Sequence, residues 1–157
     1  MSDIDVLLRV ALAMVLGAMI GFERELADKP AGLRTHMLVA GAAALLVGIG
    51  GRVIADYAVF DNSQTAIRAD PIRIIQSVII GVSFLGAGTI IRQRASQEVE
   101  GLTTAATLLF GAVIGICAGL GESLLAVVAT ALVLITVAGL KRFERWLANR
   151  KREQESA

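Results

Sequence analysis

Five apolar segments, each long enough to span a membrane, constrain the fold of this chain more than any other feature. They lie at about residues 4–22, 33–54, 72–91, 102–120 and 123–140. A helix of about 20 apolar residues crosses the roughly 30 Å hydrocarbon core of a bilayer. None of the segments alternates polar and apolar residues, as the strands of a membrane barrel do. The sequence therefore predicts an all-α polytopic membrane protein with about five transmembrane helices.

The composition fits a chain that lies in a lipid bilayer. Of the 157 residues, 55% are hydrophobic and 18% are charged, whereas soluble domains average about 25% charged residues. The formal net charge of +1 gives no reason to expect a nucleic-acid partner. The single cysteine, Cys117, lies inside an apolar segment and is predicted to be a small packing residue.

Lysine and arginine residues predict the orientation in the membrane. Six of them lie after residue 140, and others follow the first and third segments: Arg24, Lys29, Arg34, Arg92 and Arg94. Cytoplasmic segments carry the excess of basic residues, so we expect the N-terminus outside and the C-terminus in the cytoplasm. Residues 1–140 are then the transmembrane domain, and residues 141–157 are a short basic cytoplasmic tail that forms an interfacial helix.

Arg9 is a charge close to the start of the first segment. Asp5 precedes it by four residues and lies on the same helical face. One interpretation is a side chain that snorkels to the headgroups beside Asp5. The other is a functional charge within the membrane.

Glycines predict where helices approach one another closely. Gly17 and Gly21 are four residues apart in the first segment, and Gly111, Gly115 and Gly119 form two GxxxG steps in the fourth. Such faces allow close backbone contact between membrane helices. We therefore expect a homodimer or small homo-oligomer that packs partly through the face of Gly111, Gly115 and Gly119.

The third segment contains a second concentration of glycine, at Gly81, Gly86 and Gly88 in "GVSFLGAG". Tight helix packing is one interpretation. The other is a helix break that lines a cavity, as in transporters.

Charged residues are absent from the middles of the five segments, where ion pathways usually place them. A pump or a carboxylate-lined channel is therefore poorly supported. The sequence also lacks the phosphate-binding, hydrolase and zinc-protease motifs. We expect no enzymatic activity and no cofactor, and a metal site is left open.

Polar residues gather instead at three helix ends on one side of the predicted membrane domain. They are Glu23, Arg24, Glu25, Lys29, Arg34 and Thr35 between the first two segments, Arg92 after the third, and Thr103 and Thr104 at the start of the fourth. Under the predicted topology they lie at the cytoplasmic boundary. They are either interfacial anchors or a cluster that binds a ligand or a partner protein.

Local spacing predicts contacts within this group. Arg24 and Asp28 are four residues apart, as are Glu25 and Lys29, so both pairs would form if the first helix continued beyond the membrane. We expect Thr103 or Thr104 to cap the fourth helix, whose free N–H groups would attract an anion. The single histidine, His36, is either a satisfied interfacial residue or a pH sensor.

Three stretches resemble the signature blocks of the MgtC/SapB family of bacterial inner-membrane proteins, in the same order and spacing. They read "GFERELADKPAGLRTHMLVAGAA", "DPIRIIQSVIIGVSFLGAGTIIR" and "VEGLTTAATLLFGAVIGICAGLG". The resemblance implies a multi-pass protein of the bacterial inner (plasma) membrane that regulates adaptation to magnesium limitation, acid or intracellular stress, including virulence. Such a protein would act by binding other membrane machinery or a small ligand. The alternative is a transporter or channel for magnesium or another ion.

The resemblance also marks individual positions. In the first block these are Glu23, Arg24, Glu25, Lys29, Pro30, Gly32, Arg34 and Thr35. In the second they are Arg73, Gln76, Gly81, Phe84, Gly86, Gly88 and Arg92, and in the third Gly101, Thr103, Thr104, Ala105 and Gly115. Many relatives carry a soluble cytoplasmic domain after the last span, so the tail here resembles the short members of the family.

Overall fold

The computed structural model describes residues 2–60, 70–92 and 99–139. Its helices are α1 (Asp3–Leu26), α2 (Leu33–Phe60), α3 (Pro71–Thr89), α4 (Leu102–Leu120) and α5 (Ser123–Leu134), which continues as the π-helical turn η1 (Ile135–Gly139). Two short strands, β1 (Ile91–Arg92) and β2 (Val99–Glu100), pair antiparallel between α3 and α4. In the described part, four helices are long and apolar enough to span a membrane and the fifth is shorter. The predicted all-α polytopic fold is confirmed, whereas the tail at 141–157 lies outside the described residues.

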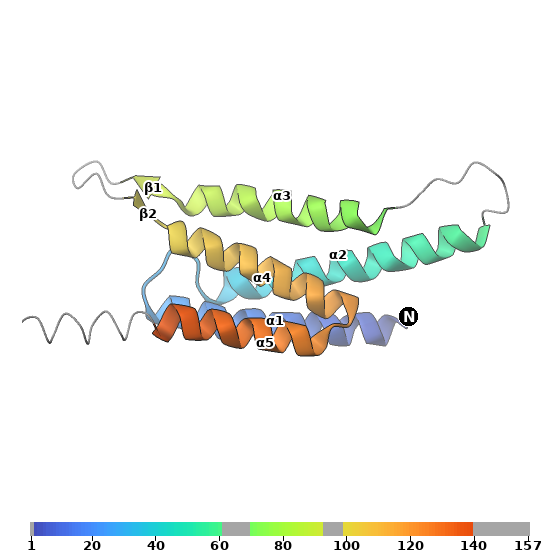
Figure 1. Cartoon of the computed structure of the whole chain (residues 1–157), viewed down its shortest axis with the longest axis horizontal. Helices are drawn as coiled ribbons and strands as arrows, with labels where there is room; N and C mark the ends of the chain where they lie inside the picture. Colours follow the sequence, from blue (N-terminus) through green and yellow to red (C-terminus); the bar gives the residue numbers. More distant parts are fainter. Residues whose placement is uncertain (1, 61–69, 93–98, 140–157) are drawn as a thin grey trace, which may run out of the picture.

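The five helices run side by side along one axis, and consecutive helices point in opposite directions (Figure 1). α2 and α4 contact each other and lie between α3 on one side and α1 on the other. The bundle therefore has two ends. The turn end, on the left of Figure 1, holds the α1–α2 turn and the β1–β2 pair. The N-terminal end, on the right, holds the start of α1 and the α4–α5 turn.

Glycines on α1 and α4 let both helices pack directly on the backbone of α2. A Cβ at Gly17 would lie 2.6 Å from the carbonyl oxygen of His36, and one at Gly119 would lie 2.8 Å from that of Ala44. A Cβ at Gly115 would overlap the carbonyl oxygen of Ala40. Small residues at these crossings replace side-chain contacts with backbone contacts, as is typical of membrane helices.

The glycine face of α4 (Gly111, Gly115 and Gly119) is therefore buried against α2 of the same chain. Gly115 and Gly119 contact α2, and Gly111 faces the ring of His36 at 3.8 Å from the position of a Cβ. The prediction that this face makes the contact between two copies is wrong, because α2 already covers it. The spacing of the glycines identified a close helix contact, but it did not identify the partner helix.

α3 is continuous from Pro71 to Thr89, so the second interpretation of "GVSFLGAG", a helix break, is wrong. The packing prediction holds for one of its glycines. A Cβ at Gly86 would lie 3.4 Å from that of Ala105 on α4, whereas Cβ atoms at Gly81 and Gly88 would meet no described atom within 4 Å. Those two glycines are exposed within the single chain.

His36 is a fully buried polar side chain at the centre of the α1–α2–α4 contact. Its Nδ1 lies 3.0 Å from the carbonyl oxygen of Gly32, and its Nε2 lies 3.1 Å from Oγ1 of Thr107 on α4. A carbonyl oxygen can only accept, so Nδ1 carries a proton. The Thr107 hydroxyl also contacts the carbonyl oxygen of Thr104 at 3.0 Å, so its single proton serves either that oxygen or Nε2 of His36. The expectation of a satisfied histidine is confirmed, although the residue lies in the core.

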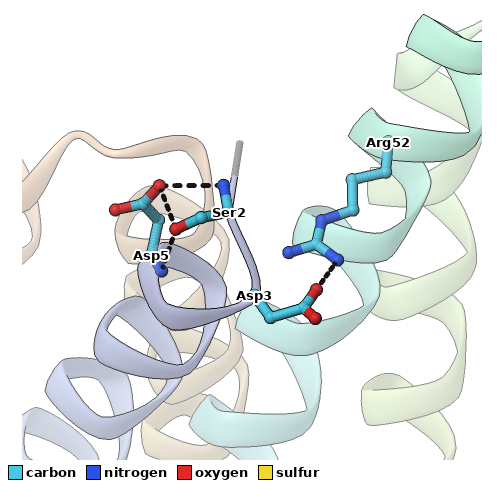
Figure 2. A network of polar contacts seen from close by, with 4 residues as sticks. All are labelled: Ser2, Asp3, Asp5 and Arg52. Atoms are coloured by element: carbon cyan, nitrogen blue, oxygen red, sulfur yellow. Dashed lines mark hydrogen bonds and ion pairs between the residues drawn. The ribbon is translucent and has the colours of Figure 1, made fainter.

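Arg9 closes the C-terminal end of α4. Its Nη1 donates to the carbonyl oxygen of Gly119 at 2.8 Å, where the helix leaves carbonyl groups without partners. Asp5 has a different role: its carboxylate accepts from the backbone N–H of Ser2 at 2.9 Å and from the Ser2 hydroxyl at 2.7 Å (Figure 2). This capping box starts α1. Arg9 therefore does not pair with Asp5, because its guanidinium reaches across to α4.

Candidate functional site

The turn end of the bundle begins where α1 stops. Lys29 donates its backbone N–H to the carbonyl oxygen of Arg24 at 3.0 Å, and Asp28 adopts a positive φ of 52°. A left-handed residue directly after a helix is the usual way to end it, and aspartate tolerates that conformation. Pro30 then follows. α1 therefore ends at Leu26, and the two i,i+4 ion pairs predicted from a longer helix are wrong.

Glu25 caps the next helix instead of pairing with Lys29. Its Oε2 accepts from the backbone N–H of Leu33, the first residue of α2, at 2.8 Å. A Cβ on Gly32 would lie 2.7 Å from the same oxygen, so glycine is the residue that gives the carboxylate room. The negative charge also suits the positive end of the helix dipole.

Arg24 is the buried cation of the turn end, with 3% of its surface exposed. Its Nε and Nη2 both lie 2.5 Å from Oε2 of Glu23. Glu23 is therefore neutralised by its neighbour in the sequence. A shielded ion pair of this kind holds the guanidinium in one position at the membrane edge.

α4 starts at the same end without a side-chain cap. Its N-cap is Gly101, with a φ of +90° and no side chain to accept a hydrogen bond. A Cβ at this position would overlap the carbonyl oxygen of Thr89, so both the backbone conformation and the space require glycine. The prediction that Thr103 or Thr104 caps α4 is wrong. Backbone N–H groups in the first turn of the helix are left for other acceptors.

These features surround a pocket of about 650 Å³, here called the turn pocket. The α1–α2 turn forms one wall, and the end of β2 with the first turn of α4 forms the other. Its lining residues are Arg24, Ala27, Asp28, Lys29, Pro30, Glu100, Gly101, Leu102, Thr103 and Thr104. Arg24 and Lys29 bring positive charge, and Asp28 and Glu100 bring negative charge. With two threonines and an uncapped helix N-terminus beside them, this lining suits a strongly polar group.

The turn pocket unites four of the residues proposed from sequence: Arg24, Lys29, Thr103 and Thr104. Glu23 lies behind it as the partner of Arg24. The other members have different positions. Glu25 caps α2, Arg34 is exposed and Thr35 is half-buried on α2, and neither of these last two lines the pocket. The side chain of Arg92 lies outside what the structure describes.

Sequence reasoning missed three polar or conformational contributors to the turn pocket, Asp28, Pro30 and Glu100, as pocket residues. The turn itself had a visible signal, because an aspartate and a proline close together mark a helix end. Glu100 had no such signal, since its position depends on the β1–β2 pairing. In the described ranges, no group of three histidine, cysteine, aspartate or glutamate side chains is placed to hold a metal ion.

The sequence matches the MgtC family over residues 10–146. The chain belongs to the MgtC family. Its relatives include protein SrpB of Synechococcus elongatus, 42% identical over 88% of this chain and 78% of its own length. Protein MgtC of Salmonella typhimurium is 40% identical over 82% of this chain and 49% of its own length, and protein SapB of Bacillus subtilis is 33% identical over 86% and 56%. The MgtC-family match includes every residue of the turn pocket.

The chain spans only about half of the length of several of these relatives. No solved structure matches the chain. Family membership therefore establishes a membrane protein of the MgtC type, and the activity of the whole relatives does not transfer with it.

Proposed function

We propose that this chain is a non-enzymatic regulatory protein that acts in adaptation to magnesium limitation, acid or intracellular stress. It binds other membrane machinery or a small ligand in the turn pocket. The turn pocket carries this proposal, because buried and exposed charges, two threonines and an uncapped helix start converge there. Membership of a family that includes proteins named MgtC and SapB supports it.

The proposal places the protein in the bacterial inner membrane with its C-terminus in the cytoplasm. Lys29 and Arg34 at the turn end, together with the basic residues after 140, favour this orientation. The turn pocket then opens on the cytoplasmic side, where soluble ligands and the cytoplasmic parts of other membrane proteins reach it. The proposal includes a homodimer whose interface lies away from the α4 glycine face, because α2 occupies that face.

The buried polar side chains favour regulation over ion conduction. In the described part they are Arg24, His36, Thr104, Thr107 and Thr130, and none is a carboxylate. Proton and divalent-cation pathways through a bilayer are usually lined by carboxylates or by exposed backbone carbonyls. His36 and Thr107 are hydrogen-bonded to each other, and α3 keeps its carbonyls in a continuous helix.

A flux assay tests the proposal against transport. We expect purified chain in liposomes to give no protein-dependent flux of Mg²⁺ or protons above that of empty liposomes, measured with trapped ion indicators. Flux that is abolished by Glu23→Gln and retained in Glu122→Gln would contradict the regulatory proposal. Glu122 is the matched control, since it is an exposed carboxylate at the opposite end of the bundle.

A further inference from the structure

A second pocket lies at the N-terminal end of the bundle, far from the turn pocket. It has a volume of about 390 Å³ and is formed by α1, α2 and α4. Two arginines, Arg9 and Arg52, contribute its charged part, and Val47, Ala55 and Leu120 contribute apolar surface. We call it the arginine pocket. The residues proposed from sequence as a binding cluster are not among those that line it.

The guanidinium of Arg9 is held in place on one side of the arginine pocket. Nη1 donates to Gly119, and the guanidinium lies against Gly121, where a Cβ would come within 2.9 Å of Cζ, Nη1 and Nη2. Gly121 has a φ of +91° and ends α4. No carboxylate in the described part of the chain pairs with Arg9. Its positive charge is therefore fixed but not neutralised by an ion pair.

Arg52 uses only one side of its guanidinium. Nη1 pairs with the carboxylate of Asp3, whereas Nε and Nη2 are shielded from solvent and have no hydrogen-bond partner among the described residues. Figure 2 shows this second edge turned away from Asp3. Nε and Nη2 are the two donors with which arginine binds phosphate or carboxylate in a bidentate manner. Shielded donors without a partner are rare in native proteins, so this edge indicates a missing acceptor.

The position of the arginine pocket indicates which acceptor is available. It lies at the ends of three apolar helices: the start of α1, the end of the apolar stretch Leu33–Ala55 of α2, and the end of α4. The ends of membrane-spanning helices lie at the level of the lipid headgroups, where phosphate is the abundant anion. The apolar residues of the pocket would meet the glycerol and the first acyl carbons of a phospholipid.

We propose that the arginine pocket binds a phosphate group through Arg9 and Arg52. Two phosphate oxygens accept from Nε and Nη2 of Arg52, and a third accepts from the free N–H groups of Arg9. Asp3 keeps its bond to Nη1 and orients Arg52 for this contact. The phosphate belongs either to the headgroup of an anionic phospholipid or to free inorganic phosphate, since both offer the same oxygens.

Titration of the delipidated full-length chain with phosphatidylglycerol, followed by native mass spectrometry, tests this proposal. We expect one tightly bound lipid, with affinity about tenfold weaker in Arg9→Gln and in Arg52→Gln, because each loses charge-assisted hydrogen bonds. Arg73→Gln is the matched control: Arg73 is an exposed arginine at the start of α3, at the same end of the bundle and outside the pocket. Its affinity for the lipid is expected to stay unchanged.

Two further probes separate the sources of the phosphate. Diacylglycerol, which has the same chains and no phosphate, is expected not to bind. If excess inorganic phosphate then fails to displace phosphatidylglycerol, the site is assigned to lipid. If inorganic phosphate displaces phosphatidylglycerol from the wild type but not from Arg52→Gln, the site is assigned to free phosphate. Equal affinity for phosphatidylglycerol in the wild type, Arg9→Gln and Arg52→Gln, with no arginine-dependent phosphate binding, overturns the proposal. If Arg9→Gln does not fold, Arg52→Gln decides, since its only described bond is to an exposed carboxylate.

Discussion

Gly115→Ala is expected to lower the free energy of unfolding by about 3 kcal/mol, the upper part of the range for overpacking a close contact. The added Cβ would overlap the carbonyl oxygen of Ala40. That oxygen belongs to the backbone of α2, so it moves only if α2 and α4 separate. The measurement is the unfolding of purified protein in detergent, by denaturant titration of helical circular dichroism.

Gly88→Ala is the control for helix propensity, because a Cβ there would meet no described atom within 4 Å. Alanine is a better helix former than glycine by about 0.5–1 kcal/mol, so this variant is expected to be as stable as the wild type or slightly more stable. The packing would be contradicted if Gly115→Ala kept the stability of the wild type and instead dissociated an oligomer. That result would show that the α4 glycine face makes the contact between copies of the chain.

His36→Ala is expected to destabilise the protein by about 3 kcal/mol, comparable to the loss of a large core side chain. The imidazole is fully buried and connects Gly32 of the α1–α2 turn with Thr107 of α4. Its removal leaves a cavity between three helices and leaves the Thr107 hydroxyl without its partner on α2. The same denaturant titration measures this effect.

Two variants of Thr107 distinguish the contribution of its hydrogen bond to stability from the contribution of its packing. Thr107→Val keeps the shape of the side chain but removes the hydroxyl that contacts Nε2 of His36, and an interhelical hydrogen bond in a membrane protein contributes about 1 kcal/mol. Thr107→Ser keeps the hydroxyl and loses one methyl group. Stability is expected to fall more in Thr107→Val than in Thr107→Ser. The reverse order would show that the methyl group, and not the hydrogen bond, stabilises this contact.

Hydropathy was sufficient to predict the helices because each one is a long apolar run with polar ends. The predicted bounds of α4, residues 102–120, are those of the structure. α1 extends to Leu26, four residues beyond its apolar run, because Asp28 provides the left-handed residue that ends it. An apolar pattern therefore locates the part of a helix in lipid, while local backbone chemistry decides where the helix ends.

Long-range contacts were the part that a single sequence did not determine. Gly115 indicated a close helix contact correctly, but the spacing is the same for a contact within the chain and for one between copies. Arg9 had a plausible partner at Asp5, four residues away, yet it bonds to Gly119, which is 110 residues away. In both cases the local pattern had several physically acceptable partners, and only the packing of α1, α2 and α4 selects one.

The candidate site was likewise predicted in part from the sequence and in part only by the structure. Arg24, Lys29, Thr103 and Thr104 were proposed from sequence because helix ends on one side of a membrane lie close together, and the turn pocket contains all four. Glu25 is as polar as its neighbours, but it satisfies the start of α2. A structural cap and a binding residue look alike in sequence, and the hydrogen-bond partner distinguishes them.

Growth of a strain that lacks its own copy of the protein, at limiting magnesium, tests the role of the turn pocket most directly. The test variant is Lys29→Gln/Thr103→Val, which changes two exposed pocket residues whose side chains make no hydrogen bond within the described part. The control is Arg34→Gln/Thr35→Val, which likewise removes one cation and one threonine hydroxyl but outside the pocket. At equal membrane abundance, the control is expected to restore growth and the pocket variant to fail. Full restoration by the pocket variant would contradict the assignment of function to the turn pocket.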